Sequence, residues 1–259
     1  MTLIDGHGRL HRDLRISLTD RCSLRCTYCM PAEGVPWLAP PALLTSDEVV
    51  RLAAVAVSLG VDEIRLTGGE PLLRPDVVDV VARLAALRRP DLPRGPEISM
   101  TTNALRLGDL AQPLAEAGLR RVNVSLDSLR RDRFTALTRR DGLAGALAGL
   151  AAADAAGLAP IKLNAVLMRG VNDDEAVDLV RFASRHGYEM RFIEQMPLDA
   201  GHTWSRAQMV TAAEILRSLD SAFELTPAAR PTSAPAESWL VDGGPATVGV
   251  IASVTRPFC

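Results

Sequence analysis

Three cysteines lie within eight residues near the start of the chain. The segment Arg21–Met30 reads RCSLRCTYCM, so Cys22, Cys26 and Cys29 follow a C-x3-C-x2-C spacing. Three thiolates at this spacing can hold three irons of a cubane [4Fe-4S] cluster, because soft sulfur ligands suit such clusters. The fourth iron then has no protein ligand, and an open coordination position is what a chelating substrate or cofactor requires. We therefore predict an iron–sulfur site with one open iron.

Two other uses of clustered cysteines fit this segment less well. A zinc site needs a fourth Cys or His, and His7 and His11 lie upstream, but no zinc-ribbon pair of cysteines follows. A thioredoxin-like site has C-x-x-C at a helix start without the additional cysteine. A secreted disulfide scaffold would spread more than four cysteines along a shorter chain. The cluster interpretation is favoured over zinc, and zinc stays open as an alternative.

Composition limits the class of protein. The chain has 259 residues, 47% of them hydrophobic and 23% charged, with a net charge of −2. This charge disfavours nucleic-acid binding, which needs a basic excess. The first twenty residues contain no apolar signal segment, and the Ala- and Leu-rich segment Gly142–Ala159 contains Asp154, which favours a core-packed helix over a membrane span. We expect a cytoplasmic protein without nucleic-acid or membrane partners.

Short strand-like runs alternate with longer helical patterns along the chain. We predict strands at Leu14–Leu18, Glu63–Thr67, Glu97–Thr101, Arg121–Leu126, Ile161–Leu167 and Met190–Glu194. We predict helices at Ser46–Leu59, Pro75–Leu87, Arg106–Ala117, Gly142–Ala156 and Asp173–Arg185. Thr45 or Ser46 can cap the first helix. Glycines suited to a left-handed residue follow four helix ends, at Gly60, Gly118, Gly157 and Gly187.

Polar and apolar side chains alternate along most of these strands. Arg15, Arg65 and Lys162 each lie between apolar neighbours. Since strand side chains point alternately to opposite faces, the apolar face meets the helices and the polar face turns inward. A closed eight-stranded barrel fills its interior and has no room for such residues. We predict an α/β fold, an open (βα)6 barrel with a wet interior, over the alternative of a sheet with one exposed face.

Two of these segments together resemble the signature of radical S-adenosylmethionine (SAM) enzymes. Tyr28 stands directly before the last cysteine of the C-x3-C-x2-C motif, and Thr67–Pro71 reads TGGEP after the second strand, where Gly68 and Gly69 allow close backbone approach to a ligand. In that superfamily this turn binds the amino group of SAM. The resemblance implies a partial TIM barrel of the radical SAM type.

A closer resemblance covers the chain from about Asp13 to Cys259. The segments DLRISLTDRCSLRCTYCMP, IRLTGGEPLLR, MTTN, VNVSLDSL, KLNAVLMRGVND, RFIEQMP and IASVTRPFC occur in the order found in the GTP 3′,8-cyclase family of molybdenum-cofactor biosynthesis. The family implies residues 1–200 as the radical SAM partial barrel and residues 201–259 as a C-terminal region leading to a second cluster. In that region we predict a helix at Gln208–Leu219, a loop at Pro227–Glu237, and strands at Trp239–Val241 and Thr247–Val254.

The resemblance implies a role for individual residues. The cluster ligands are Cys22, Cys26 and Cys29, and Cys259 matches the first ligand of the second cluster. The SAM contacts are Tyr28, Gly69, Ser125 and Met196, with Glu70 assisting. The GTP contacts are Arg15, Arg65, Thr101 and Lys162. Salt bridges to interior acids such as Asp127 are the alternative role for the cations, but a triphosphate accounts better for their number. No residue is assigned as catalytic acid or base.

The reaction implied by the family begins with one electron passing from the cluster to bound SAM. Methionine leaves, and the resulting 5′-deoxyadenosyl radical takes hydrogen from C3′ of GTP. The new radical attacks C8, and one further electron and a proton complete 3′,8-cyclo-7,8-dihydro-GTP. The implied partners are an electron donor such as flavodoxin or ferredoxin and a downstream cyclic pyranopterin monophosphate synthase. A homodimer is compatible with the family.

Two positions depart from the family pattern. Ala104 replaces the usual glycine after Thr-Thr-Asn, which costs stability if the position needs a positive φ. The sequence stops at Cys259, so the other two cysteines and the arginines of the second-cluster motif are missing. We expect a C-terminally truncated fragment of a longer cyclase. The alternatives are another radical SAM enzyme, such as a peptide-modifying one, or an inactive truncated protein that binds a cluster or SAM.

Overall fold

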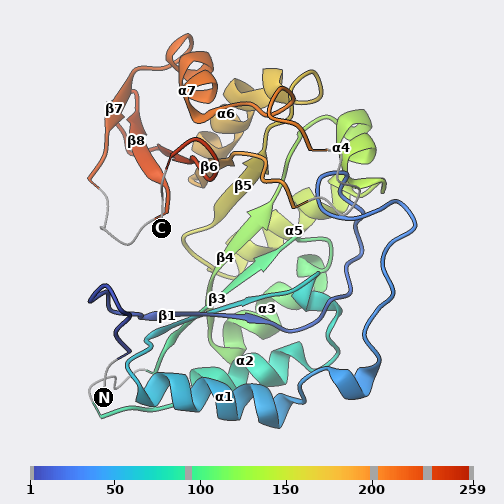
Figure 1. The fold of residues 1–259 in the computed structure, drawn as a ribbon, viewed down its shortest axis with the longest axis vertical. Helices are drawn as coiled ribbons and strands as arrows, with labels where there is room; N and C mark the ends of the chain where they lie inside the picture. Colours follow the sequence, from blue (N-terminus) through green and yellow to red (C-terminus); the bar gives the residue numbers. More distant parts are fainter. Residues whose placement is uncertain (1–2, 91–94, 199–203, 230–234, 257–259) are drawn as a thin grey trace. The chain divides into compact units, whose positions relative to one another are not determined.

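Strands and helices alternate along the computed structural model, which describes residues 3–90, 95–198, 204–229 and 235–256 (Figure 1). Two compact units are formed. The first consists of Met1–Ser23, Pro36–Asn123 and Gly145–Ala159, and the second of Leu24–Val35, Val124–Ala144 and Pro160–Cys259. Each unit therefore combines segments that are distant in sequence, and the C-x3-C-x2-C loop contributes to both.

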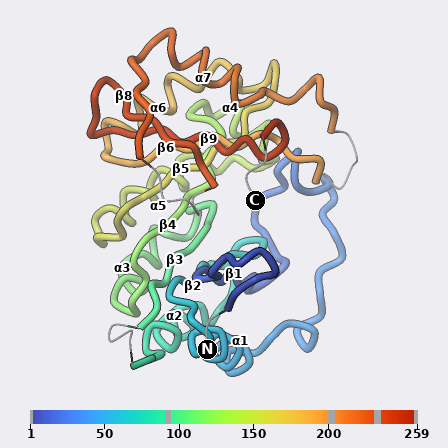
Figure 2. Tube along the Cα trace, turned by 60° about the vertical axis from the view of Figure 1, so that its left-hand side comes forward, coloured from blue at the N-terminus to red at the C-terminus, as the bar shows by residue number. Residues whose placement is uncertain are grey.

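The first unit is built from parallel βα repeats. Its elements are β1 (Asp13–Ser17), α1 (Ser46–Ser58), β2 (Glu63–Thr67), α2 (Val77–Ala85), β3 (Glu97–Thr102), α3 (Leu107–Ala117), most of β4 (Leu119–Ser125) and most of α5 (Leu143–Ala155), with 3-10 turns at Pro40–Ala42 and Pro71–Leu73. β1, β2 and β3 lie side by side in parallel, and α2 packs between α1 and α3 (Figures 1 and 2). In the register, Arg15 pairs with Arg65 and Arg65 with Ser99, so these three side chains share one face.

The second unit continues the parallel pattern and then changes direction. Its elements are α4 (Arg131–Thr138), β5 (Lys162–Val166), a 3-10 turn at Asp173–Glu175, α6 (Ala176–His186), β6 (Glu189–Ile193), α7 (Ala212–Asp220), β7 (Leu225–Pro227), β8 (Glu237–Val241) and β9 (Thr247–Ile251). β5, β6 and β9 are parallel neighbours, whereas β8 and β7 add antiparallel strands beyond β9. Lys162 pairs with Glu189 and Asn164 with Arg191 on one face.

Burial follows the alternation that the sequence predicts. In β2, β5 and β6 buried apolar residues alternate with half-buried residues, which are polar except for Val166 and Ile193 at the ends of β5 and β6. Leu66, Leu163 and Phe192 are each fully buried. β3 differs, because Ser99 on its polar face is fully buried as well. The apolar faces therefore form the core, and the polar faces stay available for polar groups.

The helix boundaries have local causes. Thr45 accepts from the backbone N–H of Glu48, whose carboxylate accepts from the N–H of Thr45, which is a complete capping box before α1. Thr211 and Glu214 form the same box before α7. The predicted left-handed glycines have φ values of 110° at Gly60, 107° at Gly118, 72° at Gly157 and 71° at Gly187.

Two elements are absent from the sequence predictions. α4 was unpredicted because its sequence, RDRFTALT, is mostly polar and buries only Phe134, Leu137 and Thr138. Arg133 compensates through ion pairs with Asp174 and Glu175. β7 is a three-residue strand that ends at Pro227, the first residue of the predicted loop Pro227–Glu237. Residues 230–234 of this predicted loop lie outside the described residues. The last predicted strand ends at Ile251 rather than Val254.

A glycine in α5 allows close contact with the turn after β3. A Cβ atom on buried Gly149 would stand 2.1 Å from the carbonyl oxygen of Ala104 and 3.1 Å from Cβ of Leu107. The carbonyl oxygen belongs to the backbone, and the position of the Leu107 Cβ is set by the backbone of α3. Neither atom can therefore move away by rotation of a side chain. Gly149 therefore fixes how closely α5 approaches this turn.

We predict that Gly149→Ala lowers the free energy of unfolding by about 1–3 kcal/mol, because the added methyl overpacks a backbone contact. Gly145→Ala is the matched control in the same helix. Its Cβ would meet only Leu105 at 3.4 Å, so the helix propensity of Ala should give a gain of up to about 1 kcal/mol. Chemical denaturation measures both variants, and equal effects would show that the close contact does not limit packing.

Candidate functional site

The loop that carries the three cysteines is held by backbone hydrogen bonds to α4. The backbone N–H of Arg25 donates to Thr138 O at 2.9 Å, and that of Thr27 donates to Leu137 O at 2.9 Å. Arg139, in a left-handed conformation with φ 54°, donates to the carbonyls of Arg25 and Met30, both at 3.0 Å. The helix that sequence reasoning missed thus fixes the segment bearing Cys26 and Cys29.

The thiols suit the predicted cluster. Cys22 and Cys26 are half-buried and Cys29 is exposed, and none of the three is in a disulfide. The N–H groups of Cys29 and Met30 both donate to Cys26 O, at 3.0 and 2.9 Å, which forms a tight turn. Three reduced thiols on a fixed loop are the donor set that three irons of a cubane need, so the residues fit the group.

Tyr28 is linked to the end of β4 through Asp127. Its Oη donates to Asp127 Oδ2 at 2.7 Å, while the N–H of Val166 donates to Asp127 Oδ1 at 2.9 Å. Burial raises the pKa of Asp127 to about 6, although both hydrogen bonds lower it. Burial, and then the Asp127 charge, also raise the pKa of Tyr28. Asp127, the alternative salt-bridge partner for the interior cations, thus accepts from Tyr28 and Val166 instead.

The TGGEP turn lies directly against the backbone that precedes Cys22. The N–H of Gly69 donates to Thr19 O and that of Glu70 to Arg21 O, both at 2.7 Å. A Cβ on Gly68 would stand 2.4 Å from Thr19 O, and one on Gly69 would stand 2.3 Å from Arg21 O. We predicted that these glycines allow approach to a ligand. The structure shows an additional reason for them, since they allow two stretches of backbone to meet.

Glu70 joins this turn to the turn after β3. Its Oε1 accepts from the N–H of Leu72 at 3.0 Å and from Thr102 Oγ1 at 2.7 Å, and its Oε2 accepts from the N–H of Asn103 at 2.7 Å. The side chain is 1% exposed, and this burial raises its pKa despite the hydrogen bonds. Both oxygens thus serve the protein's own turns, and a direct role on the SAM amino group stays a prediction.

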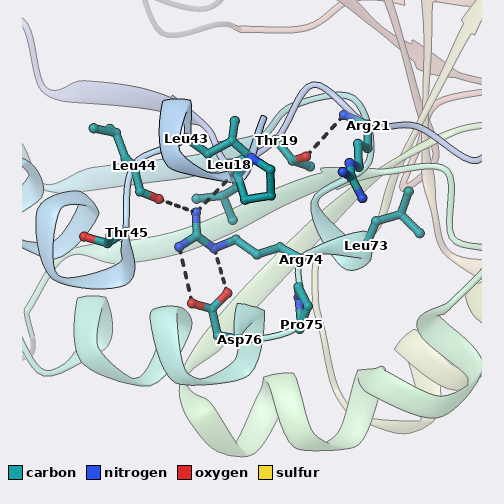
Figure 3. A pocket seen from close by; sticks show the side chains of 11 residues that line it. Leu18, Thr19, Arg21, Leu43, Leu44, Thr45, Leu73, Arg74, Pro75 and Asp76 are labelled. Atoms are coloured by element: carbon teal, nitrogen blue, oxygen red, sulfur yellow. Dashed lines mark hydrogen bonds and ion pairs between the residues drawn. The ribbon is translucent and has the colours of Figure 1, made fainter. Parts of the chain in front are cut away.

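Arg74 closes a cavity of about 380 Å³ beside β1 (Figure 3). Its guanidinium forms a two-point contact with Asp76, at 2.7 and 3.3 Å, and donates to the carbonyls of Leu18 and Leu44, at 3.3 and 2.9 Å. The remaining lining is mostly apolar and includes Leu43 and Leu73. Because its donors are used within the protein, Arg74 holds the segment before α1 against the end of β1.

Two of the predicted GTP-binding cations on strands, Arg65 and Lys162, are paired with a carboxylate on their own face. Arg65 Nη2 lies 2.8 Å from Glu63 Oε1, and Arg121 also contacts Glu63. Lys162 Nζ lies 3.0 Å from one oxygen of Glu189. Arg15 is exposed on the same face as Arg65.

Arg191 and Glu189 belong to the same polar face and were not predicted as site residues. Arg191 Nε lies 2.6 Å from the Glu189 oxygen that Lys162 does not use. Although burial opposes it, the charges of Arg191 and then Lys162 hold the pKa of Glu189 below its usual value. The predicted strand Met190–Glu194 includes Arg191 but excludes Glu189, so only the structural register shows that Glu189 lies opposite Lys162.

Several polar atoms on these faces have unused hydrogen-bonding capacity. Buried atoms that find no hydrogen-bond partner within the described ranges are Arg65 Nε, Ser99 Oγ and Asn123 Oδ1 in the first unit and Asn164 Oδ1 in the second. An unpaired buried polar atom is costly, so such atoms indicate a place for water or a polar ligand. Since both donors and acceptors are among them, these atoms suit water or a polar ligand.

The other predicted site residues lie near strand ends. Thr101, in β3, is half-buried and its Oγ1 accepts from Asn123 at 3.5 Å. Ser125 is the half-buried last residue of β4. Met196 follows β6 and is 37% exposed, which is unlike a core residue. Cys259 lies outside the described residues. The structure thus brings Arg15, Arg65 and Thr101 into the first unit, and Tyr28, Ser125, Lys162 and Met196 into the second.

Ala104 adopts the conformation that its position requires. It is fully buried with φ 65°, in the left-handed region that favours glycine. The positive φ on which the expected cost of Ala depends is therefore confirmed. The N–H of Ala104 donates to Thr102 Oγ1 at 3.0 Å, which helps to hold the turn.

Comparison with known proteins identifies the family. Residues 16–183 match the model of the Radical SAM superfamily, and residues 188–259 match the model described as Molybdenum Cofactor Synthesis C. A GTP 3′,8-cyclase of Streptomyces coelicolor is 63% identical over 260 residues, which cover 99% of this chain and 75% of that protein. The chain belongs to the GTP 3′,8-cyclase family of radical SAM enzymes. A second family member, from Rhodococcus opacus, is 56% identical over 99% of this chain and 72% of its own length.

Solved structures support the fold at low sequence identity. Streptococcus suis SuiB bound to S-adenosylmethionine has a TM-score of 0.66 and 18% identity, covering 83% of this chain and 48% of that one. HydG, a maturase of the [FeFe]-hydrogenase, has a TM-score of 0.59 and 13% identity, covering 80% and 49%. The predicted α/β fold, a partial barrel of the radical SAM type, is confirmed. Within the described residues, no helix is long and apolar enough to cross a membrane.

The raised pKa of Asp127 predicts a pH-dependent stability. Because the folded state binds the Asp127 proton more tightly than the unfolded state, stability falls as pH rises from about 4 to about 6. Relative to Asp127→Asn, the wild-type chain should lose about 2 kcal/mol of unfolding free energy between pH 4.5 and 7.5. Urea denaturation at both pH values measures the difference. An equal difference at both would mean that Asp127 titrates normally.

Tyr28→Phe extends this test. The substitution removes a hydrogen bond to the charged form of Asp127, so the pH-dependent loss should move to higher pH.

Proposed function

We propose that this chain converts GTP to 3′,8-cyclo-7,8-dihydro-GTP, the first step of molybdenum-cofactor biosynthesis. The observation that carries the proposal is the 63% identity with a GTP 3′,8-cyclase across 99% of the chain. The match of residues 188–259 to the Molybdenum Cofactor Synthesis C model supports the same pathway. When bound, a [4Fe-4S] cluster and SAM supply a 5′-deoxyadenosyl radical that can take hydrogen from C3′ of the ribose.

The chain's own residues hold these groups in place. Cys22, Cys26 and Cys29 bind the cluster on the loop fixed by α4. The SAM-binding residues are Tyr28, Gly69, Ser125 and Met196. Glu70 keeps the TGGEP turn in position through Thr102 and Asn103. The protein thus supplies orientation and shielding, and we assign it no catalytic acid or base.

The polar faces bind the triphosphate of GTP. The proposed contacts are Arg15, Arg65, Thr101 and Lys162, and the geometry adds Arg191. Lys162 and Arg191 are held in defined positions because Glu189 accepts from both. A bound phosphate contacts Lys162 and Arg191 either together with Glu189 or in its place. Because Glu189 already holds both side chains, little side-chain ordering is needed when the phosphate binds.

The family also indicates partners and location. A one-electron donor such as flavodoxin or ferredoxin reduces the cluster, and a cyclic pyranopterin monophosphate synthase uses the product. We propose a cytoplasmic protein, in which a homodimer is compatible with the family. The division into residues 1–200 and 201–259 stays a prediction, and Cys259 is the predicted first ligand of a second cluster.

Anaerobic reconstitution with iron and sulfide tests the proposal. The chain should then form 5′-deoxyadenosine from SAM and cyclised nucleotide in a GTP-dependent manner. Cys26→Ala should abolish SAM cleavage, because two thiolates cannot hold the cubane. Cleavage that depends on a peptide instead of GTP would favour a different radical SAM reaction. SAM cleavage without cyclised GTP would contradict the proposed cyclase activity of this chain, and zinc without iron would exclude the cluster.

Lys162→Ala tests the polar face separately. Loss of a half-buried charge-assisted contact should raise the Kd for GTP by about 10- to 100-fold while SAM binding stays nearly unchanged. Arg217→Ala removes an exposed cation from α7 of the same unit and should leave both affinities unchanged. Isothermal titration gives the two constants. A selective loss of SAM binding would show that Lys162 has a different role.

A further inference from the structure

The turn after β3 brings an asparagine to the start of the cysteine loop. Asn103 is 6% exposed, and its Nδ2 donates to Ser23 Oγ at 3.0 Å. The same nitrogen also donates toward Cys22 Sγ at 4.0 Å. A primary amide carries two hydrogens on this nitrogen, so both acceptors can be served at once.

The orientation of this amide is fixed by its other end. Asn103 Oδ1 accepts from the backbone N–H of Leu105 at 3.1 Å. In the reversed orientation the NH2 group would face the N–H of Leu105, so two donors would oppose each other. The nitrogen therefore faces Ser23 and the thiol of Cys22.

The backbone of Asn103 is held as firmly as its side chain. Its N–H donates to Glu70 Oε2 at 2.7 Å, and the neighbouring Thr102 donates to Glu70 Oε1. Glu70 belongs to the TGGEP turn, whose N–H groups bond the backbone before Cys22. A closed set of hydrogen bonds within the first unit thus connects the TGGEP turn, Asn103 and Cys22.

We propose that Asn103 is a positioning residue that donates a hydrogen bond to the Cys22 thiolate and raises the reduction potential of the cluster. A hydrogen bond to a thiolate ligand stabilises the additional negative charge of the reduced cluster, and cluster potentials respond to such bonds. An amide donor has no titration in the working pH range, so its effect is constant with pH. The proposal rests on cluster binding by Cys22 but not on the identity of the substrate.

Potentiometric titration of the reconstituted chain, followed by the EPR signal of the reduced cluster, tests this role. Asn103→Ala should shift the midpoint potential to a more negative value at full iron content. Asn103→Asp keeps the shape but replaces the donor with a carboxylate, so its shift should be larger. Ser23→Ala is the matched control, because it removes the other acceptor and leaves the Cys22 contact; its potential should stay at the wild-type value.

The outcomes separate the two proposals. A wild-type chain that assembles no cluster would contradict the proposed function. A loaded wild-type chain whose potential is unchanged in Asn103→Ala and Asn103→Asp would contradict the role of Asn103 alone. If Asn103→Ala loses iron, the isosteric Asn103→Asp decides, and a potential equal to the wild-type value in that variant overturns the proposal.

Discussion

The site depends on a contact between two stretches of backbone that lie too close together for a side chain to fit between them. The TGGEP turn and the residues before Cys22 are joined by hydrogen bonds of 2.7 Å from Gly69 and Glu70. The space between the two stretches of backbone has no room for a Cβ atom at Gly68 or Gly69. The segments proposed to bind the cluster and SAM are thus joined directly by backbone hydrogen bonds. The hydrogen bonds of Glu70 extend this rigidity to the turn after β3.

A second set of restraints acts on the other half of the cysteine loop. In the second unit, α4 and Arg139 bind the backbone around Cys26, and Asp127 holds Tyr28. These restraints use polar groups rather than apolar packing. Burying Asp127 costs free energy, which its raised pKa reflects. The positions of the ligands are thus maintained at some expense of stability, as is common where function fixes geometry.

The sequence predicted the repeating architecture well because hydrophobic periodicity and capping are local. β2 agrees at both ends with its predicted range, and the left-handed glycines lie where expected. The same periodicity predicted the polar strand faces that carry Arg15, Arg65 and Lys162, whereas the binding roles of these cations stay predictions. The sequence missed α4, which is mostly polar and whose Arg133 pairs with distant Asp174 and Glu175, and it missed the Asn103 contacts with Ser23 and Cys22. Contacts between residues far apart in the chain leave no local pattern in the sequence. About eighty residues separate Asn103 from Ser23 and Cys22.

The carboxylate between Lys162 and Arg191 has a consequence for ligand exchange. Without a paired carboxylate, Lys162 and Arg191 would attract any small anion, and free phosphate would compete with the substrate for them. With Glu189 in place, the local charge of this trio is +1 rather than +2, and an anion must displace an internal partner. Weakly charged ions gain little from that exchange, whereas an extended, highly charged chain of phosphates can engage several cations together. Under the proposed role of Lys162 and Arg191 in binding the triphosphate, β5 and β6 would thus discriminate against small anions.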